Sequence, residues 1–137
     1  MFVTIISALA IFISSQFFLE LVLKPLIRYK EAIYSVDSNL KFYANRIGTQ
    51  YALAKEDEYT KTVDVIRKLS CELEASYKQI FAKGVFEKVR LVPIGGDVAE
   101  ACARLIRISN SVGQSGVGIY DDIKEIRHRL GISPLND

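Results

Sequence analysis

The sequence has very few histidine and cysteine residues, two types from which catalytic and metal sites are commonly built. His128 is the only histidine, and Cys71 and Cys102 are the only cysteines. These three residues are far apart in the chain and lack the paired spacing of zinc ligands. No serine or cysteine stands in a recognisable nucleophile motif with His128. The sequence therefore predicts a protein without catalytic residues, metal or cofactor, and both thiols are expected to be small buried groups in a reducing compartment.

Two further patterns resemble functional motifs without completing them. Helical ribonucleases of bacterial conflict systems carry an arginine a short spacer before a histidine, but residues 121–124 before His128 contain no arginine. Residues 113–118 are glycine-rich like a phosphate-binding loop, yet no strand precedes them and no Gly-Lys-Ser/Thr follows. We expect this stretch to connect two helices. Asp121, Asp122 and Glu125 could hold a cation loosely, but a solvated helix start explains acidic residues there.

The polar side chains with the clearest spacing lie in an apolar segment. Gln16, Glu20 and Lys24 are four residues apart, so a helix places them on one side. A carboxylate inside a membrane span is costly and usually faces protein or water. In one interpretation Glu20 lies near the membrane boundary and pairs with Lys24. In the other, several copies associate, Gln16 and Glu20 line a pore or a polar interface, and Ser14 and Ser15 permit close packing.

The segment that positions these residues has the length of a membrane span. From residue 2 to residue 23 the only charge is Glu20, and a helix needs about 20 residues to cross the hydrocarbon core. A secretory signal peptide would end in small residues, where this chain has the bulky run LVLKPLIRYK. A buried core helix would usually be shorter. We expect residues 1–23 to form a transmembrane helix and residues 24–137 to form one domain.

Basic residues follow the apolar segment directly and indicate its orientation. Lys24, Arg28 and Lys30 come first, and no lysine or arginine precedes the segment. The positive-inside rule then places the N-terminus outside and residues 24–137 in the cytoplasm, as in a bacterial inner-membrane protein. These three side chains are expected to meet anionic lipid headgroups. Residues 56–137 carry nearly equal numbers of basic and acidic side chains, so no nucleic-acid partner is expected.

An apolar stripe with alternating spacings of three and four predicts a helix over residues 26–47. Such a stripe keeps one apolar seam facing a partner. The seam could pack inside one chain, as an antiparallel hairpin with the next helix, or between chains as an assembly device. Pro25 near the membrane exit is compatible with a kink or a helix restart, and Gly48 with the helix end. The seam consists of Leu26, Tyr29, Ile33, Val36, Leu40, Tyr43 and Ile47.

Three more helices are predicted, over residues 56–83, 97–110 and 119–130. The first has an acidic start that suits the helix dipole. The second is expected to begin with a capping box of Asp97 and Glu100. Residues 85–93 are read as a connector or a brief helix. The predicted fold is all-α: one N-terminal transmembrane helix that continues into a cytoplasmic bundle of about four helices.

Short runs along the chain resemble a family of small bacterial single-span membrane proteins. These are LKPLIRYKEAI at residues 23–33, FYAN at 42–45, RLIRISNS at 104–111 and IRHRLGI at 126–132. The resemblance implies a span followed by a helical cytoplasmic domain, and it implies no activity. More distantly, the layout is similar to membrane accessory proteins of CRISPR-type defence systems, in which a span and a helical cytosolic domain assemble into a pore.

Three functions from different classes follow as hypotheses. The first is a self-assembling single-pass protein, a coiled-coil oligomer that acts as a pore-forming or membrane-perturbing effector in antiviral defence. The second is a membrane-tethered, non-enzymatic adaptor that docks a cytosolic protein. The third is a sensor that binds a nucleotide near the basic helix or the loop at 113–118. The expected partners are the lipid bilayer, further copies of the chain and a cytosolic protein.

Overall fold

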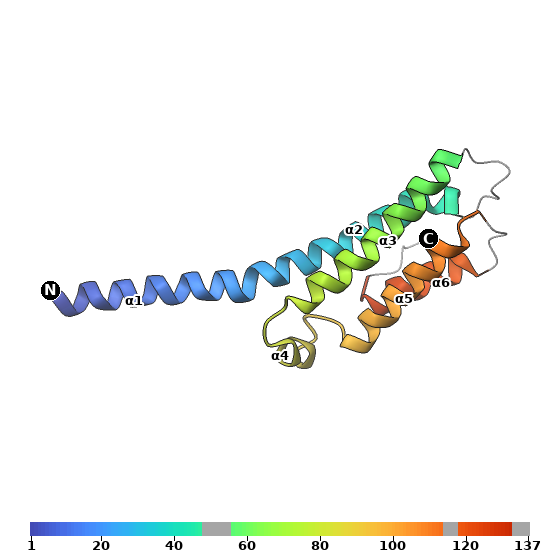
Figure 1. The fold of residues 1–137 in the computed structure, drawn as a ribbon. Helices are drawn as coiled ribbons and strands as arrows, with labels where there is room; N and C mark the ends of the chain where they lie inside the picture. The colour runs from blue at the N-terminus through green and yellow to red at the C-terminus, as the bar shows by residue number, and fades with distance from the viewer. Residues whose placement is uncertain (48–55, 114–117, 133–137) are drawn as a thin grey trace.

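The computed structural model describes residues 1–47, 56–113 and 118–132, and it confirms the all-helical class. An apolar N-terminal helix projects from a helical bundle formed by the rest of the described chain (Figure 1). No strand occurs among the described residues. The helices are α1 (Phe2–Phe18), a π-helical turn (Leu19–Leu23), α2 (Lys24–Ile47), α3 (Glu56–Lys78), α4 (Lys83–Lys88), α5 (Gly95–Ser111) and α6 (Ile119–Arg129).

Helices α1 and α2 form one continuous helix, which confirms the predicted continuation of the apolar helix into the bundle. A π-helical turn precedes Pro25 in place of the kink or restart that the sequence would have allowed. Proline has no N–H donor, and its ring crowds the carbonyl group four residues earlier, which here belongs to Leu21. One residue before Pro25, the Lys24 N–H group donates to the Leu19 carbonyl, five residues back. This wider turn accommodates the proline without ending the helix.

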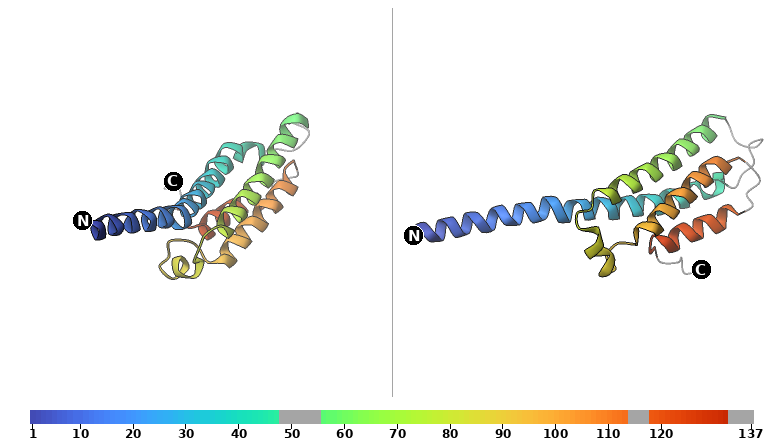
Figure 2. Two further views of the ribbon diagram at one scale, coloured as in Figure 1. Left: turned by 60° about the vertical axis from the view of Figure 1, so that its left-hand side comes forward. Right: turned by 60° about the horizontal axis from the view of Figure 1, so that its bottom comes forward.

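The core lies where α3 packs against α2 on one side and α5 on the other, with α6 against α5. Figure 2 shows these helices side by side along much of their length. Leu73 on α3, Leu105 and Ile108 on α5 and Ile126 on α6 have no more than 1 % of their surface exposed. Fully burying side chains of this size contributes roughly 1.5–3 kcal/mol each, so the bundle has its own core within one chain.

The structure corrects the predicted end of one helix and the predicted start of another. The helix predicted over 56–83 ends at Lys78, and Lys83 instead begins the short helix α4. Helix α5 begins at Gly95 without a side-chain cap, so the predicted capping box is wrong. Asp97 instead binds Arg129 across the helix interface, where a charge-assisted hydrogen bond outweighs a cap to the backbone. The predicted helix end at Gly48 lies outside the described residues.

A buried hydroxyl in the core provides a test of this packing. Tyr29 is fully buried, and none of the described residues forms a hydrogen bond with its hydroxyl group. The centroid of its ring lies 5.5 Å from the centroid of the Tyr77 ring. The Tyr77 hydroxyl, in contrast, donates a hydrogen bond to Glu87. An unsatisfied buried polar group costs about 1–3 kcal/mol. We therefore expect Tyr29→Phe to raise the free energy of unfolding by about 1 kcal/mol.

Tyr77→Phe is the matched control, because it removes a hydroxyl that has a partner, and it should lower stability by about 1 kcal/mol. Chemical unfolding of the detergent-solubilised chain, followed by circular dichroism, measures both variants. Equal destabilisation by the two changes would show that the Tyr29 hydroxyl has a partner after all.

Candidate functional site

Helix α1 exposes an apolar surface that no other part of the described chain covers. None of its residues is buried, and the helix extends away from the bundle (Figure 1). The continuous helix that it begins, Phe2–Ala44, contains a stretch long and apolar enough to cross a membrane, by length and composition. The Ser7 and Ser15 hydroxyls donate to the carbonyl groups of Val3 and Ile11, four residues earlier, so these polar groups are satisfied within the helix. Contiguous apolar surface of this extent is rare on soluble monomers.

Gln16, Glu20 and Lys24 were predicted to lie on one side of the apolar helix, and two of them pair with each other. The Lys24 ammonium group donates to the Glu20 carboxylate, and both side chains are about half exposed. Gln16 lies one turn earlier and is exposed. The pair is the arrangement expected of a carboxylate at a membrane boundary. That Gln16 and Glu20 line a pore stays a prediction.

The predicted seam packs inside this one chain. Tyr29, Ile33, Val36, Leu40 and Ile47 are at most 4 % exposed. Leu26 and Tyr43 are partly buried at the edge of the same core. Because α3 covers this side of α2, the hairpin interpretation accounts for the seam without a second copy of the chain.

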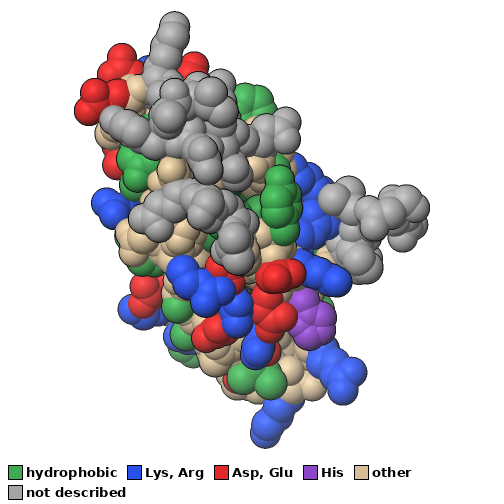
Figure 3. Space-filling view, turned by 90° about the vertical axis from the view of Figure 1, so that its right-hand side faces the viewer, with side chains coloured by type: hydrophobic (Ala, Val, Ile, Leu, Met, Phe, Trp, Pro, Cys, Tyr) green, Lys and Arg blue, Asp and Glu red, His purple; other side chains and the backbone are tan. Residues whose placement is uncertain are grey.

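The predicted basic residues lie at the start of α2. Lys24, Arg28 and Lys30 are all exposed. Lys30 also contributes to a groove of about 360 Å³ whose other walls come from Glu87, Lys88 and residues 90–94, from Asp97 of α5 and from residues 128–131. Its basic lining includes Lys88 and Arg90. At the opposite end of the bundle, the visible acidic and basic side chains are interspersed (Figure 3). The groove brings together basic residues from distant parts of the sequence.

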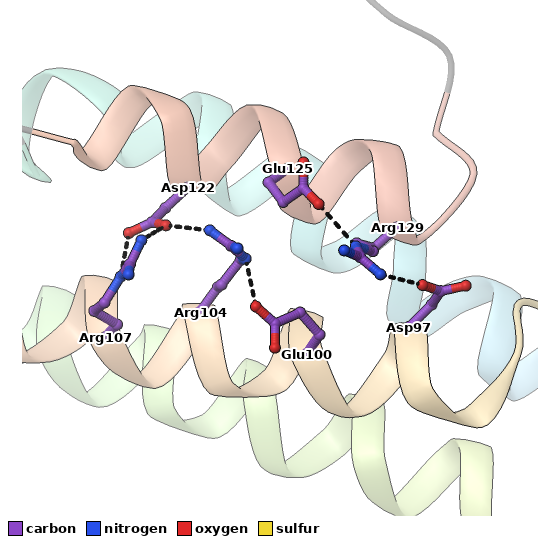
Figure 4. A network of polar contacts seen from close by, with 7 residues as sticks. All are labelled: Asp97, Glu100, Arg104, Arg107, Asp122, Glu125 and Arg129. Carbon is purple, nitrogen blue, oxygen red and sulfur yellow. Dashed lines mark hydrogen bonds and ion pairs between the residues drawn. The ribbon is translucent and has the colours of Figure 1, made fainter.

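Sequence patterns did not reveal the ion-pair network between α5 and α6 (Figure 4). Asp122 is 3 % exposed, so the prediction of a solvated acidic helix start is wrong for this residue. Its carboxylate accepts from Arg104 Nη1 at 2.8 Å and from Arg107 Nε at 2.7 Å. These groups are 15 to 18 residues apart along the chain. In the sequence, the only feature that pointed to this network was the position of Arg104 and Arg107, three residues apart beside the apolar face of α5.

Further ion pairs link the helices at the same interface. Arg129 binds Asp97 of α5 at 2.7 Å and Glu125 of its own helix at 2.8 Å. The Arg129 guanidinium group lowers the pKa of Glu125 through this hydrogen bond. Between α2 and α6, Arg127 binds Asp37 at 2.7 Å. Asp122, Arg127 and Arg129 of α6 thus link this helix to α5 and α2, so these charges serve to position the helices.

The two cysteines and the histidine differ in burial. Cys71 is exposed, so the prediction that both thiols are buried is wrong for this residue. It lies on α3 beside the buried positions Ser70 and Leu73, off the apolar face. Cys102 is buried, and burial raises the pKa of its thiol. Ser70 Oγ donates to the Cys102 carbonyl at 3.2 Å, which links α3 to α5. His128 is exposed.

The raised pKa of the Tyr77 hydroxyl leads us to expect a loss of stability at alkaline pH. Burial, together with the hydrogen bond to Glu87, raises its pKa from 10.0 to about 12. A raised folded-state pKa gives stability that is complete below pH 10 and is lost as pH rises through 12. The free energy of unfolding should therefore fall between pH 10 and 12, and less steeply in Tyr77→Phe. Denaturant titrations at stepped pH measure this, and equal slopes in both proteins would contradict it.

Among the described residues, the ion pairs of α5 and α6 hold the bundle together, and α1 is an apolar helix that contributes no buried residue. Within residues 1–47, 56–113 and 118–132, no three cysteine, histidine or acidic side chains are placed to hold a metal ion. The loop considered for phosphate binding falls largely on residues 114–117, outside the described part. No protein-family model, curated protein or solved structure matches this chain.

Proposed function

We propose that this chain is a single-span membrane protein whose helical domain is a non-enzymatic adaptor at the cytoplasmic face of a bacterial inner membrane. In this proposal α1 crosses the bilayer with its N-terminus outside. The observation that carries the proposal is that α1 is apolar and wholly exposed, while the bundle buries a core of its own. A helix that contributes nothing to the core needs another apolar environment, and a bilayer supplies one.

The adaptor role is supported by the outer side of α2. Ile27, Tyr34 and Phe42 are 54 %, 68 % and 71 % exposed. Their spacing of seven and eight residues puts them on one side of the helix, opposite the buried seam. Exposed aromatic side chains at helical spacing suit a protein partner that lays a helix against them. Tyr34→Ala with Phe42→Ala should weaken capture of that partner and leave the span in place.

The natural thiols test the topology in the full chain. Cys71 is exposed and Cys102 is buried, so a membrane-impermeant maleimide should modify Cys71 alone. We expect labelling in inverted membrane vesicles and none in intact spheroplasts, because the bundle is cytoplasmic. Cys71→Ser controls for reaction at Cys102. Labelling of intact spheroplasts would overturn the orientation. A mature mass reduced by loss of the first residues would identify a cleaved signal sequence instead.

A self-assembling pore or membrane-perturbing effector is the second candidate, because Gln16 and Glu20 are exposed on the apolar helix. Lining a pore would require Glu20 to face other copies as well as Lys24. The mass of the detergent-solubilised particle separates the candidates: a monomer excludes the pore. If oligomers form, dye leakage from liposomes that is lost in Glu20→Ala would favour the pore over the adaptor.

A further inference from the structure

The segment between α3 and α5 exposes an unusual number of large apolar side chains. Phe81, Val85, Val89, Leu91 and Ile94 are between 48 % and 64 % exposed. Across the described residues of α3 to α6 and their connections, only Ile106 and Tyr120 are comparable. We call these five residues, with Lys83, Lys88 and Arg90, the connector surface.

The connector surface is held in place by contacts on its inner side. Val92 is buried and Phe86 packs against the core. Glu87 accepts hydrogen bonds from the Tyr77 hydroxyl and from the Gly95 N–H group. Phe86 is turned inward, whereas Val85 on the same short helix and Val89 directly after it are exposed. The exposure is therefore a property of an anchored segment, and a partner is needed to cover it.

The position of this surface indicates what the partner is. Helix α4 lies at the end of the bundle from which α1 emerges, in the views of Figure 1 and Figure 2 alike. Lys30 of α2 lines the same groove as Lys88, Arg90 and Ile94. Lys30 is seven residues beyond Leu23, a rise of about 10 Å along a helix. The headgroup region occupies roughly 5–8 Å on each side of the hydrocarbon core, so the backbone of Lys30 lies just beyond the headgroups and the groove lies beside them.

The charges of the surface complement an anionic bilayer. Lys88 and Arg90 are exposed among the apolar side chains, whereas Lys83 is half-buried with its ammonium group 5.2 Å from the centre of the Tyr77 ring. The basic start of α2 is adjacent. Glu87 is the only acidic residue from 79 to 94, and it is bound to Tyr77 and Gly95. Apolar side chains interspersed with lysine and arginine are the composition of segments that lie in a lipid interface.

We propose that the connector surface is a second membrane contact, which inserts its apolar side chains into the interface of an anionic leaflet. This inference rests on the proposed span of α1. With both contacts made, the bundle is fixed in one orientation against the membrane, and the outer side of α2 is presented to the cytoplasm in a defined direction.

Depth-dependent fluorescence quenching in the full-length chain tests the inference separately from the span. In a Cys71→Ser background, an environment-sensitive label is placed by Val89→Cys on the connector, by Phe12→Cys in the span or by Tyr120→Cys at the start of α6. The proteins are reconstituted in phosphatidylcholine vesicles, with and without phosphatidylglycerol, that contain spin-labelled lipid. We expect strong quenching at position 12, quenching at 89 several-fold above that at 120, and enhancement at 89 by phosphatidylglycerol.

The outcomes are distinguishable. Quenching at position 12 with none at 89 would overturn the connector contact and leave the span intact. No quenching at 12 would overturn the span and, with it, the inference. Equal quenching at position 89 with and without phosphatidylglycerol would overturn the proposed charge complementarity.

A charge-insertion variant supplies the second arm. Val85→Asp with Phe81→Asp should abolish quenching at position 89 and leave quenching at position 12 unchanged. Ile106→Asp with Lys124→Asp is the control, because it adds acidic groups elsewhere on the bundle surface. Circular dichroism checks that each variant retains its helices. Persistence of quenching at 89 in the folded connector variant would contradict the proposal.

Discussion

A chain that carries Leu9→Arg together with Phe12→Arg is expected to move from the membrane fraction to the soluble fraction. Each arginine near the centre of a span costs about 2.5–3.5 kcal/mol, while leucine and phenylalanine favour insertion. Two such changes amount to roughly 6 kcal/mol or more, which corresponds to a shift of over 10⁴ in the insertion equilibrium. Fractionation of cells followed by an alkaline wash of the membranes measures the effect.

The bundle itself should survive this change, because α1 contributes no buried residue to it. Tyr34→Arg with Ile106→Arg is the matched control, since both positions are exposed on the bundle. That control should stay in the membrane fraction. If the α1 double variant also stays there, α1 is not what attaches the chain to the membrane.

The second large effect is expected at the α5–α6 interface. Replacing both Arg104 and Arg107 with methionine leaves the Asp122 carboxylate, whose side chain is 5 % exposed, without its cationic partners. Removing one side of a buried ion pair costs about 3–5 kcal/mol. Chemical unfolding of the full chain in detergent should show a loss of this size.

Two further variants separate the ion pairs from simple packing. Asp122→Asn should cost less than the double arginine change, because Arg107 is 60 % exposed and can reach solvent. Adding Asp122→Asn to the double methionine variant should restore a large part of the loss, because no buried charge then remains unpaired. Strict additivity of the three substitutions would show that the network is not coupled.

The two proposed membrane contacts would together restrict the orientation of the bundle relative to the membrane. A single span leaves the attached domain free to rotate and tilt at the membrane surface. A second contact through the connector would hold the exposed outer side of α2 at a fixed height and direction. An adaptor benefits from this restriction, because a partner then meets a surface that is already oriented and loses less freedom on binding.

Cys71 and Cys102 show where single-residue predictions from sequence reach their limit. Both are isolated cysteines in predicted helices, and both were expected to be buried. Cys102 lies on the face of α5 that meets α3, whereas Cys71 lies on α3 just off its buried face. Helical periodicity gives the relative rotation of residues on one helix. The placement of the neighbouring helix decides how wide the buried face is.

The amino-acid sequence was enough to predict the helical class, the apolar N-terminal segment and the apolar seam of α2. These follow from chain-local physics: the length of an apolar run, the 3.6-residue period and the helix-breaking residues between segments. Only the tertiary structure shows that α3 covers the seam, that Asp122 meets Arg104 and Arg107, and that Lys88, Arg90 and Ile94 line one groove with Lys30. Each of these joins residues from different helices. Such contacts depend on how whole helices pack, and that is set by the summed burial of their apolar faces and not by any local pattern.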